Sequence, residues 1–179
     1  MMKKSVLIWA AVSILFSGYA FAMDYQHKLE AEDMTVFWTI DQDKIHVKLT
    51  AKTTGWVAIG FDPETAMQGA DIIIGAVKND KVKIEDHYGD RKRGHASDEK
   101  LGGKNNVLNP AGEEADGVTT ISFSLALDTK EEWDKPIVPE KMSRMMIAYG
   151  AGRDSFNDRH AFRAVYDINY ATGETKKIK

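Results

Sequence analysis

Residues 56–77 read WVAIGFDPETAMQGADIIIGAV, which is two apolar runs separated by a polar loop. The runs, Trp56 to Phe61 and Ile72 to Val77, are apolar at successive positions rather than at alternate ones. Strands of this composition are covered on both faces, so both runs are predicted to lie in the middle of a sheet. Met145 to Tyr149 has the same character and predicts a third central strand.

The segments around these runs alternate apolar and polar residues with a period of two. Ile45, Val47 and Leu49, for example, are separated by polar residues, and this period is typical of a strand with one buried face. The segments with a strand pattern are residues 34–40, 45–51, 82–85, 120–125 and 161–168. With turn signals such as Asn79-Asp80 and Asp116-Gly117 between them, about eight strands predict an all-β fold, an antiparallel β-sandwich.

Two features interrupt this pattern of strands. Residues 129–134 begin with Thr129-Lys130-Glu131-Glu132, a capping-box spacing that predicts a short helix, and Pro136 limits it to about two turns. Gly89 to Gly117 is rich in Gly, Asn, Asp, Lys and Arg and is predicted to be one long loop. The loop is either a solvated excursion or a flap over a ligand face, with Arg91-Lys92-Arg93 as its charged edge.

The first 22 residues have the organisation of a secretory signal peptide. Lys3 and Lys4 precede an apolar run from Val6 to Phe16, and Ala20-Phe21-Ala22 is the small-x-small pattern that signal peptidase cuts after. The run is too short to span a bilayer comfortably, which takes about 20 apolar residues. Cleavage leaves residues 23–179 as a single predicted domain, exported to the periplasm or secreted.

Composition excludes several classes of function. The chain has no Cys, which rules out zinc-thiolate sites, iron–sulfur clusters, lipoprotein anchoring and covalently attached c-type haem. Lys3 and Lys4 leave with the leader, so 22 of the 24 basic residues remain against 27 acidic ones, a balance that disfavours nucleic-acid binding. No nucleophile elbow, zinc-binding His pair or phosphate loop is found, and no two carboxylates are expected to meet in an apolar setting. The sequence therefore predicts a protein that is not an enzyme.

Two residues are candidates for holding a cofactor. Met67 lies in the polar loop between two apolar strands, where it either folds back onto the sandwich edge or offers a thioether to iron. His160 lies where a polar loop meets the last predicted strand, and it is either an ordinary surface histidine or an imidazole ligand. Among the other histidines, His46 and His87 fall on polar strand faces, and His95 lies in the predicted long loop.

The order of motifs resembles that of the DOMON domain family. The resemblance rests on Phe37-Trp38, on GWVAIGF at residues 55–61 and on MQGADIIIG at residues 67–75. The downstream motifs that fit are Asp86-His87-Tyr88, ISFS at 121–124, MIAYG at 146–150 and the late His160. The match covers roughly Met34 to Ile168, most of the mature chain.

The resemblance implies an immunoglobulin-like β-sandwich and a candidate cofactor. Some members of the family, such as the cytochrome domain of cellobiose dehydrogenase, bind b-type haem through a Met and a His. By motif, Met67 and His160 match these ligands, which implies one noncovalent haem b. The candidates to line its pocket, each equally well explained as core, are Trp56, Phe61, Ile73, Tyr149 and Phe162.

The resemblance also implies a role. Two strong axial ligands leave no open position for substrate or oxygen, which favours electron transfer with a redox partner protein over catalysis. Arg159 or Arg163 is a candidate to pair with a haem propionate, the alternative being a solvated surface charge. Two other readings remain open: a haem-free module that binds a sugar or another small ligand, and a noncatalytic subunit of a larger oxidoreductase.

Overall fold

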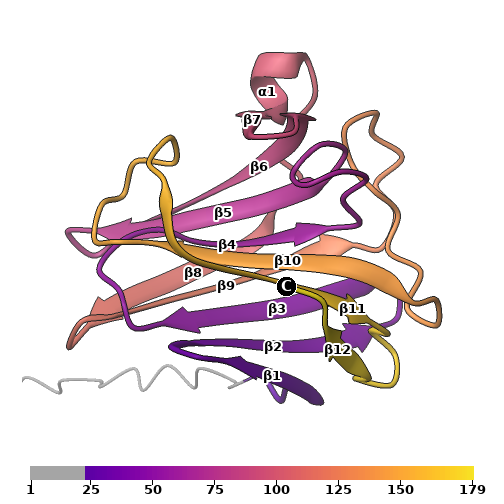
Figure 1. The fold of residues 1–179 in the computed structure, drawn as a ribbon, viewed down its shortest axis with the longest axis horizontal. Coiled ribbons are helices and arrows are strands. Elements are labelled where there is room, and N and C mark those ends of the chain that lie inside the picture. The colour runs from indigo at the N-terminus through magenta and orange to yellow at the C-terminus, as the bar shows by residue number, and fades with distance from the viewer. Residues whose placement is uncertain (1–22) are drawn as a thin grey trace, which may run out of the picture.

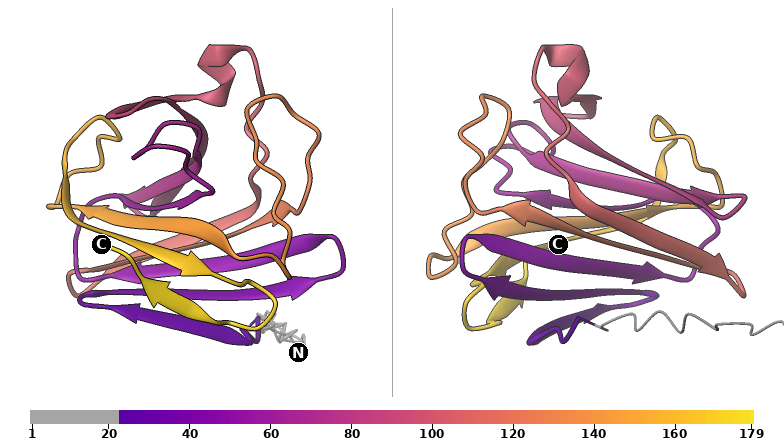
Figure 2. Two further views of the ribbon diagram at one scale, coloured as in Figure 1. Left: turned by 45° about the vertical axis from the view of Figure 1, so that its right-hand side comes forward. Right: turned by 180° about the vertical axis from the view of Figure 1, so that it is seen from behind.

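The computed structural model describes residues 23–179, and the predicted signal peptide, residues 1–22, lies outside them. Two antiparallel sheets form two layers (Figures 1 and 2). The five-stranded sheet has the order β1 (His27–Ala31), β2 (Met34–Asp41), β3 (Lys44–Ala51), β9 (Val118–Ala126) and β8 (Leu108–Ala115). The seven-stranded sheet has the order β12 (Thr175–Lys177), β11 (His160–Ile168), β10 (Ser143–Gly150), β4 (Val57–Phe61), β5 (Asp71–Lys78), β6 (Lys81–Arg91) and β7 (Gly94–Ser97). The predicted all-β sandwich is confirmed.

The main core lies between the two sheets. The period-two alternation of the strands provides its apolar side chains: Ile45, Val47 and Leu49 of β3, for example, all point inward and are fully buried. Trp38 of β2 is also buried there, and its indole Nε1 donates a 3.0 Å hydrogen bond to the carbonyl of Tyr170. That bond satisfies the polar atom of the indole in an otherwise apolar setting.

A second, smaller apolar cluster covers the outer face of the seven-stranded sheet. It consists of Trp56, Ala58, Ile74, Ala76 and Phe156. Phe156 comes from the connection between β10 and β11, which folds back over the sheet. β4 and β5 are therefore buried on both faces, as their uninterrupted apolar runs predict.

The prediction of one long loop from Gly89 to Gly117 is wrong. β6 continues to Arg91, β7 and the helix α1 (Asp98–Leu101) follow, and β8 pairs with β9 along the edge of the smaller sheet. Every residue of β8 is exposed, so no alternation marks this strand in the sequence. Polar composition therefore indicates an edge strand here rather than a loop. Within residues 89–117, the longest stretch outside strands and helix is residues 102–107.

The position of the short helix is also wrong. Residues 129–134 are irregular apart from a turn at 132–133. The Asp128 carboxylate accepts a hydrogen bond from the backbone N–H of Lys130, whose φ of 62° is incompatible with a helix. Such side-chain bonds to nearby backbone compete with helix formation. The helix is instead α1, with acidic Asp98 in its first turn and Gly102 in the left-handed conformation at its end. No helix among residues 23–179 is long and apolar enough to cross a membrane.

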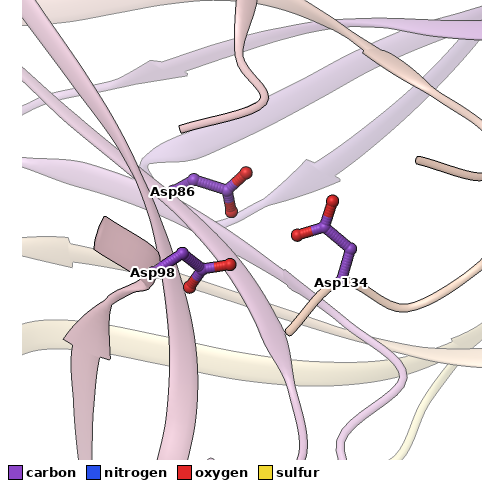
Figure 3. Close-up of side chains that lie close together, drawn as sticks. All are labelled: Asp86, Asp98 and Asp134. Atoms are coloured by element: carbon purple, nitrogen blue, oxygen red, sulfur yellow. The ribbon is translucent and has the colours of Figure 1, made fainter. Parts of the chain in front are cut away.

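Four carboxylates meet at one end of the sandwich, against the expectation that none would pair in an apolar setting. Asp71 and Asp86 come from neighbouring strands. Asp98 begins α1 and Asp134 belongs to the connection between β9 and β10, and Figure 3 shows these two beside Asp86. Burial, followed by the charge of Asp134, raises the pKa of Asp86 to about 7. Burial, followed by the charge of Asp86, raises the pKa of Asp98 to about 8.

The raised pKa values predict an unusual dependence of stability on pH. Between about pH 6 and pH 8 the extra protons that these carboxyls hold in the folded state outweigh the opposite effect of the lowered pKa values of the histidines, so the free energy of unfolding falls as pH rises. In chelator-containing buffer we expect a loss on the order of a few kcal/mol across this range. Urea unfolding at several pH values measures it, and an unfolding free energy that is flat or rises with pH contradicts the prediction.

Candidate functional site

A cleft of about 990 Å³ lies on the outer face of the seven-stranded sheet. Its floor is apolar, because strand alternation turns Trp56, Ala58 and Gly60 outward while Ile59 and Phe61 of the same strand belong to the main core. The outward residues of β5 and β10 that join the floor are Ile72, Ile74, Met146 and Ala148. The floor of the cleft is therefore apolar across several strands.

Met67 lines this cleft from the β4–β5 loop. The loop is fixed to β6 by backbone hydrogen bonds: Gly69 N–H donates to Gly89 O at 2.8 Å, and Gly89 N–H donates to Ala70 O at 2.8 Å. Met67 N–H also donates to Lys92 O at 3.4 Å, which ties the loop to the β6–β7 hairpin. The position of Met67 thus depends on backbone contacts with a regular strand rather than on a free loop.

Gly89 permits this close approach, because a Cβ there would lie 1.7 Å from the Met67 carbonyl oxygen. We expect Gly89→Ala to displace the Met67 loop and to lower the free energy of unfolding by about 1–3 kcal/mol, the usual cost of overpacking. Urea unfolding measures the loss. The control is Gly117→Ala, where a Cβ meets nothing within 4 Å and only the left-handed backbone is strained. A loss no larger for Gly89→Ala than for the control would argue against the tight packing.

His160 is the first residue of β11 and lines the same cleft. A register shift between Tyr149 and Gly150 pairs Gly150 with His160. This pair lies beside the Val57 end of β4, whereas the Met67 loop follows the Phe61 end of the same strand. Arg163 Nη1 lies 3.1 Å from His160 Nε2. Burial, followed by the charge of Arg163, lowers the pKa of His160, which keeps the imidazole neutral and able to act as a ligand at neutral pH.

The rim of the cleft is basic although the chain as a whole carries a net negative charge of −3. Seven lining residues are Arg or Lys and two are Asp or Glu. The basic ones are Arg91, Lys92, Arg93, Arg144, Arg159, Arg163 and Lys179. Within residues 23–179, neither Arg93, Arg159 nor Arg163 has an ion-pair partner. An apolar floor with free cations at its rim suits a flat apolar ligand that carries anionic groups.

A family model for the DOMON domain matches residues 30–150. The chain belongs to the DOMON domain family. The matched segment includes Met67 and the floor of the cleft, and it ends ten residues before His160.

Curated relatives of this DOMON domain are much longer proteins. The mouse DBH-like monooxygenase protein 1 is 24% identical over 147 residues, which is 80% of this chain and 23% of the relative. The human protein of that name is 32% identical over 56 residues, and the Drosophila melanogaster MOXD1 homolog 2 is 25% identical over 127 residues. The chain thus spans less than a quarter of the length of these relatives.

Two solved structures share the fold of the domain. The cytochrome b domain of pyranose dehydrogenase from Coprinopsis cinerea superposes with a TM-score of 0.60 at 11% identity, covering 82% of both chains. The cytochrome domain of Myriococcum thermophilum cellobiose dehydrogenase gives a TM-score of 0.53 at 9% identity, again over 82% of both chains. At this identity the likeness shows the fold alone.

The structure brings together only part of the predicted pocket of the DOMON domain. Met67, His160, Trp56 and Arg163 all line the cleft, as does Arg159. The other predicted pocket residues, Phe61, Ile73, Tyr149 and Phe162, belong to or pack against the main core between the sheets. Each of these four residues alternates with an outward-facing neighbour, so it lies on the opposite face of its strand from the cleft.

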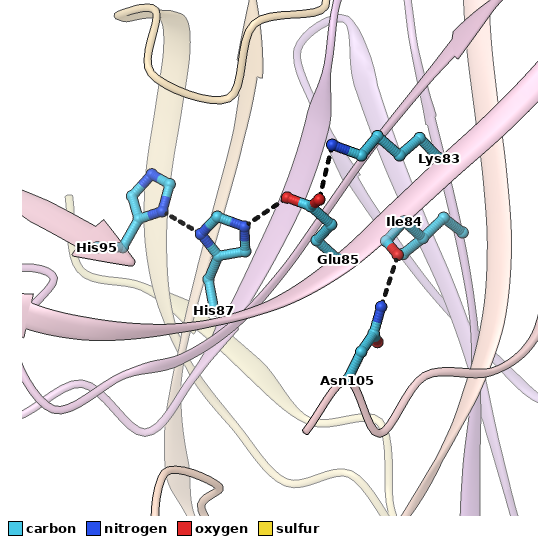
Figure 4. A network of polar contacts seen from close by, with 6 residues as sticks. All are labelled: Lys83, Ile84, Glu85, His87, His95 and Asn105. Carbon is cyan, nitrogen blue, oxygen red and sulfur yellow. Dashed lines mark hydrogen bonds and ion pairs between the residues drawn. The ribbon is translucent and has the colours of Figure 1, made fainter. Parts of the chain in front are cut away.

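Sequence reasoning assigned two histidines to the wrong surroundings. His87 lies on the outer face of β6 but is 5% exposed, because Phe156 and His95 cover that face. His95 belongs to β7 rather than to a loop, and it lines the cleft. Their Nδ1 atoms lie 2.7 Å apart, and His87 Nε2 lies 3.0 Å from the Glu85 carboxylate (Figure 4). The burial could not be seen in the sequence, because Phe156 is remote from β6 and β7, which carries His95, was predicted as loop.

Proposed function

We propose that this DOMON domain binds one noncovalent b-type haem in the outer-face cleft and acts in electron transfer. The observation that carries the proposal is that Met67 and His160, 93 residues apart in sequence, line a single cleft with an apolar floor and a basic rim. Membership of the DOMON domain family supports it, as do the two cytochrome domains that share the fold.

The side chains of Met67 and His160 are suitable ligands for a haem iron. A thioether and a neutral imidazole are both known axial ligands, and the lack of Cys requires a noncovalent attachment. Trp56, Ala58 and Ile74 would contact the macrocycle face or edge and keep water from it. Arg163 now donates to His160 Nε2. If His160 Nε2 bound iron, the Arg163 guanidinium would lose this hydrogen bond and could pair with a haem propionate.

The haem, when bound, supplies a reversible one-electron couple. With haem bound, Met67 and His160 would hold the iron, the apolar floor would exclude water, and the basic rim would bind the anionic groups. The described domain carries no further group that we assign to catalysis. Electrons would therefore pass to and from a redox partner protein, or from another domain, in keeping with the greater length of the relatives.

Titration of haem-free protein with haemin tests the proposal. We expect saturation at one haem per chain, and native mass spectrometry of the product should show a single added haem that acidified organic solvent removes. Protein that takes up no haem when supplied with excess contradicts the proposal. In that case a haem-free module that binds a small anionic ligand in the same cleft takes its place.

We also propose that the domain works outside the cytoplasm, in the periplasm or as a secreted protein. The support is the leader-like organisation of residues 1–22. N-terminal sequencing of protein from an exporting host is expected to begin at Met23. An intact N-terminus on protein from the cytoplasmic fraction of such a host would refute the export proposal.

A further inference from the structure

The carboxylate cluster of Asp71, Asp86, Asp98 and Asp134 has no role in the cleft and requires its own explanation. One oxygen of each of Asp86, Asp98 and Asp134 lies within 4.8 Å of the others (Figure 3). Asp71 adjoins them, because Ile73 pairs with Asp86 and Asp71 pairs with Tyr88, so Asp71 and Asp86 are diagonal neighbours on one face of the sheet. Two strands, one helix and one connection thus converge on one point.

The cluster has too few positive partners for its charge. None of the ion pairs within residues 23–179 includes any of these four carboxylates. The donors present are neutral: Asn106 N–H to Asp86 at 3.1 Å, Asn106 Nδ2 to Asp134 at 2.7 Å, and Lys135 N–H to Asp71 at 3.4 Å. Buried carboxylates without cationic partners are strongly disfavoured unless they take up protons or coordinate a metal.

The unpartnered oxygens give a second observation that points to a ligand. Asp71, Asp86 and Asp98 are 5%, 2% and 1% exposed, and one oxygen of each is buried without a hydrogen-bond partner. Asp71 is independent of the three-residue cluster, since it comes from a different strand, yet its free oxygen is also buried at this end of the sandwich. Folded proteins rarely leave buried polar atoms unpaired without an ion, a water or a functional reason.

We propose that Asp86, Asp98 and Asp134, supported by Asp71, bind one calcium ion. The donor set consists of hard oxygens with no His or Cys, which suits calcium or magnesium rather than zinc or copper. Calcium accepts irregular sets of carboxylate oxygens, whereas magnesium demands near-octahedral geometry and keeps several waters. Carboxylates from three separate segments form an irregular set, which favours calcium.

The ion would lie outside the cleft, but it would stabilise two segments of the cleft wall, the Met67 loop and β7. Asp71 follows the Met67 loop directly, and Asp98 follows β7, the strand that carries His95. A bound ion would tie both segments to the β9–β10 connection that carries Asp134. This inference goes beyond the proposed function, and it holds whether or not haem binds.

Terbium luminescence and thermal unfolding test the proposal on the purified mature protein at pH 8. Trp133 lies beside the cluster, since its ring and Asp98 Cβ approach the same point at Gly103. We expect terbium emission sensitised by Trp133, displacement of terbium by calcium, and one calcium per chain. Saturating calcium should raise the melting temperature by about 5 °C or more relative to chelator.

Matched variants separate a bound ion from a merely structural cluster. Asp98→Asn keeps the shape of the side chain and should remove the calcium effect, while its melting temperature in chelator should equal or exceed that of the wild type. Asp134→Asn, at a half-buried position, serves if Asp98→Asn fails to fold. Asp154→Asn is the control, because Asp154 also has an unpartnered buried oxygen but lies outside the cluster. Its calcium effect should match that of the wild type.

Two results would overturn the proposal. If neither calcium nor terbium binds at pH 8, the cluster holds protons only. If calcium raises the melting temperature of Asp98→Asn and Asp134→Asn as much as that of the wild type, the ion binds elsewhere.

Discussion

Replacement of His160 with alanine is expected to lower the haem affinity of the domain by about 100-fold or more. Loss of an outer-shell partner alone costs 10–100-fold in metal affinity in typical sites, so removal of the imidazole itself should cost at least the upper end of that range. His160 is only partly buried at the start of β11, so the fold should survive the change. Competition with apomyoglobin measures the affinity, and circular dichroism checks the fold.

His95→Ala is the matched control for this prediction. His95 lines the same cleft and is therefore the rival imidazole for the iron. His95 Nδ1 is already hydrogen-bonded to His87 Nδ1 at 2.7 Å, and we do not propose His95 as an iron ligand. If His95→Ala loses haem while His160→Ala retains it with an unchanged spectrum, the ligand assignment is wrong.

Replacement of Met67 with leucine is expected to lower the reduction potential by on the order of 0.1 V and to open one axial position. The side chain keeps its bulk and loses its sulfur, and a thioether stabilises the reduced iron relative to harder ligands. Exogenous imidazole or carbon monoxide should then bind readily, whereas the wild type should resist both. Potentiometric titration and ligand-binding spectra provide the measurements.

Met146→Leu is the control for Met67, because Met146 also lines the floor of the cleft. It lies on a strand in the middle of the sheet, where its thioether serves as packing. We expect its potential and ligand binding to match those of the wild type. If Met146→Leu rather than Met67→Leu opens the iron to ligands, the thioether ligand is Met146.

Alternation predicted the strands that have one face in the core, and uninterrupted apolar runs predicted β4, β5 and β10 as central strands. β8 escaped prediction because an exposed edge strand needs no apolar face, as its polar residues 108–115 show. The helix at Asp98–Leu101 was also missed, although Ser97 before it and Gly102 after it are typical boundary residues. The capping-box spacing at Thr129 was a stronger local helix signal, but hydrogen bonds from Asp128 and Thr129 side chains to nearby backbone N–H groups prevent a helix there.

Motif order singled out Met67 and His160, which the structure places at one cleft, but it could not predict the walls of that cleft. In a strand that is apolar on both faces, composition does not reveal which face is inner. Trp56 and Phe61 therefore looked equivalent in sequence, while the structure places Trp56 at the cleft and Phe61 in the core. The carboxylate cluster is a still longer-range feature, because Asp71, Asp86, Asp98 and Asp134 meet only through strand register and two connections.

The visible absorption spectrum of the reduced, haem-reconstituted domain tests the central claim most directly. If Met67 and His160 both hold the iron, the spectrum should show the sharp, split bands of a six-coordinate low-spin haem, and added carbon monoxide should leave them unchanged. A five-coordinate high-spin spectrum, or the same six-coordinate spectrum in the Met67→Leu and His160→Ala double variant, would contradict the claim.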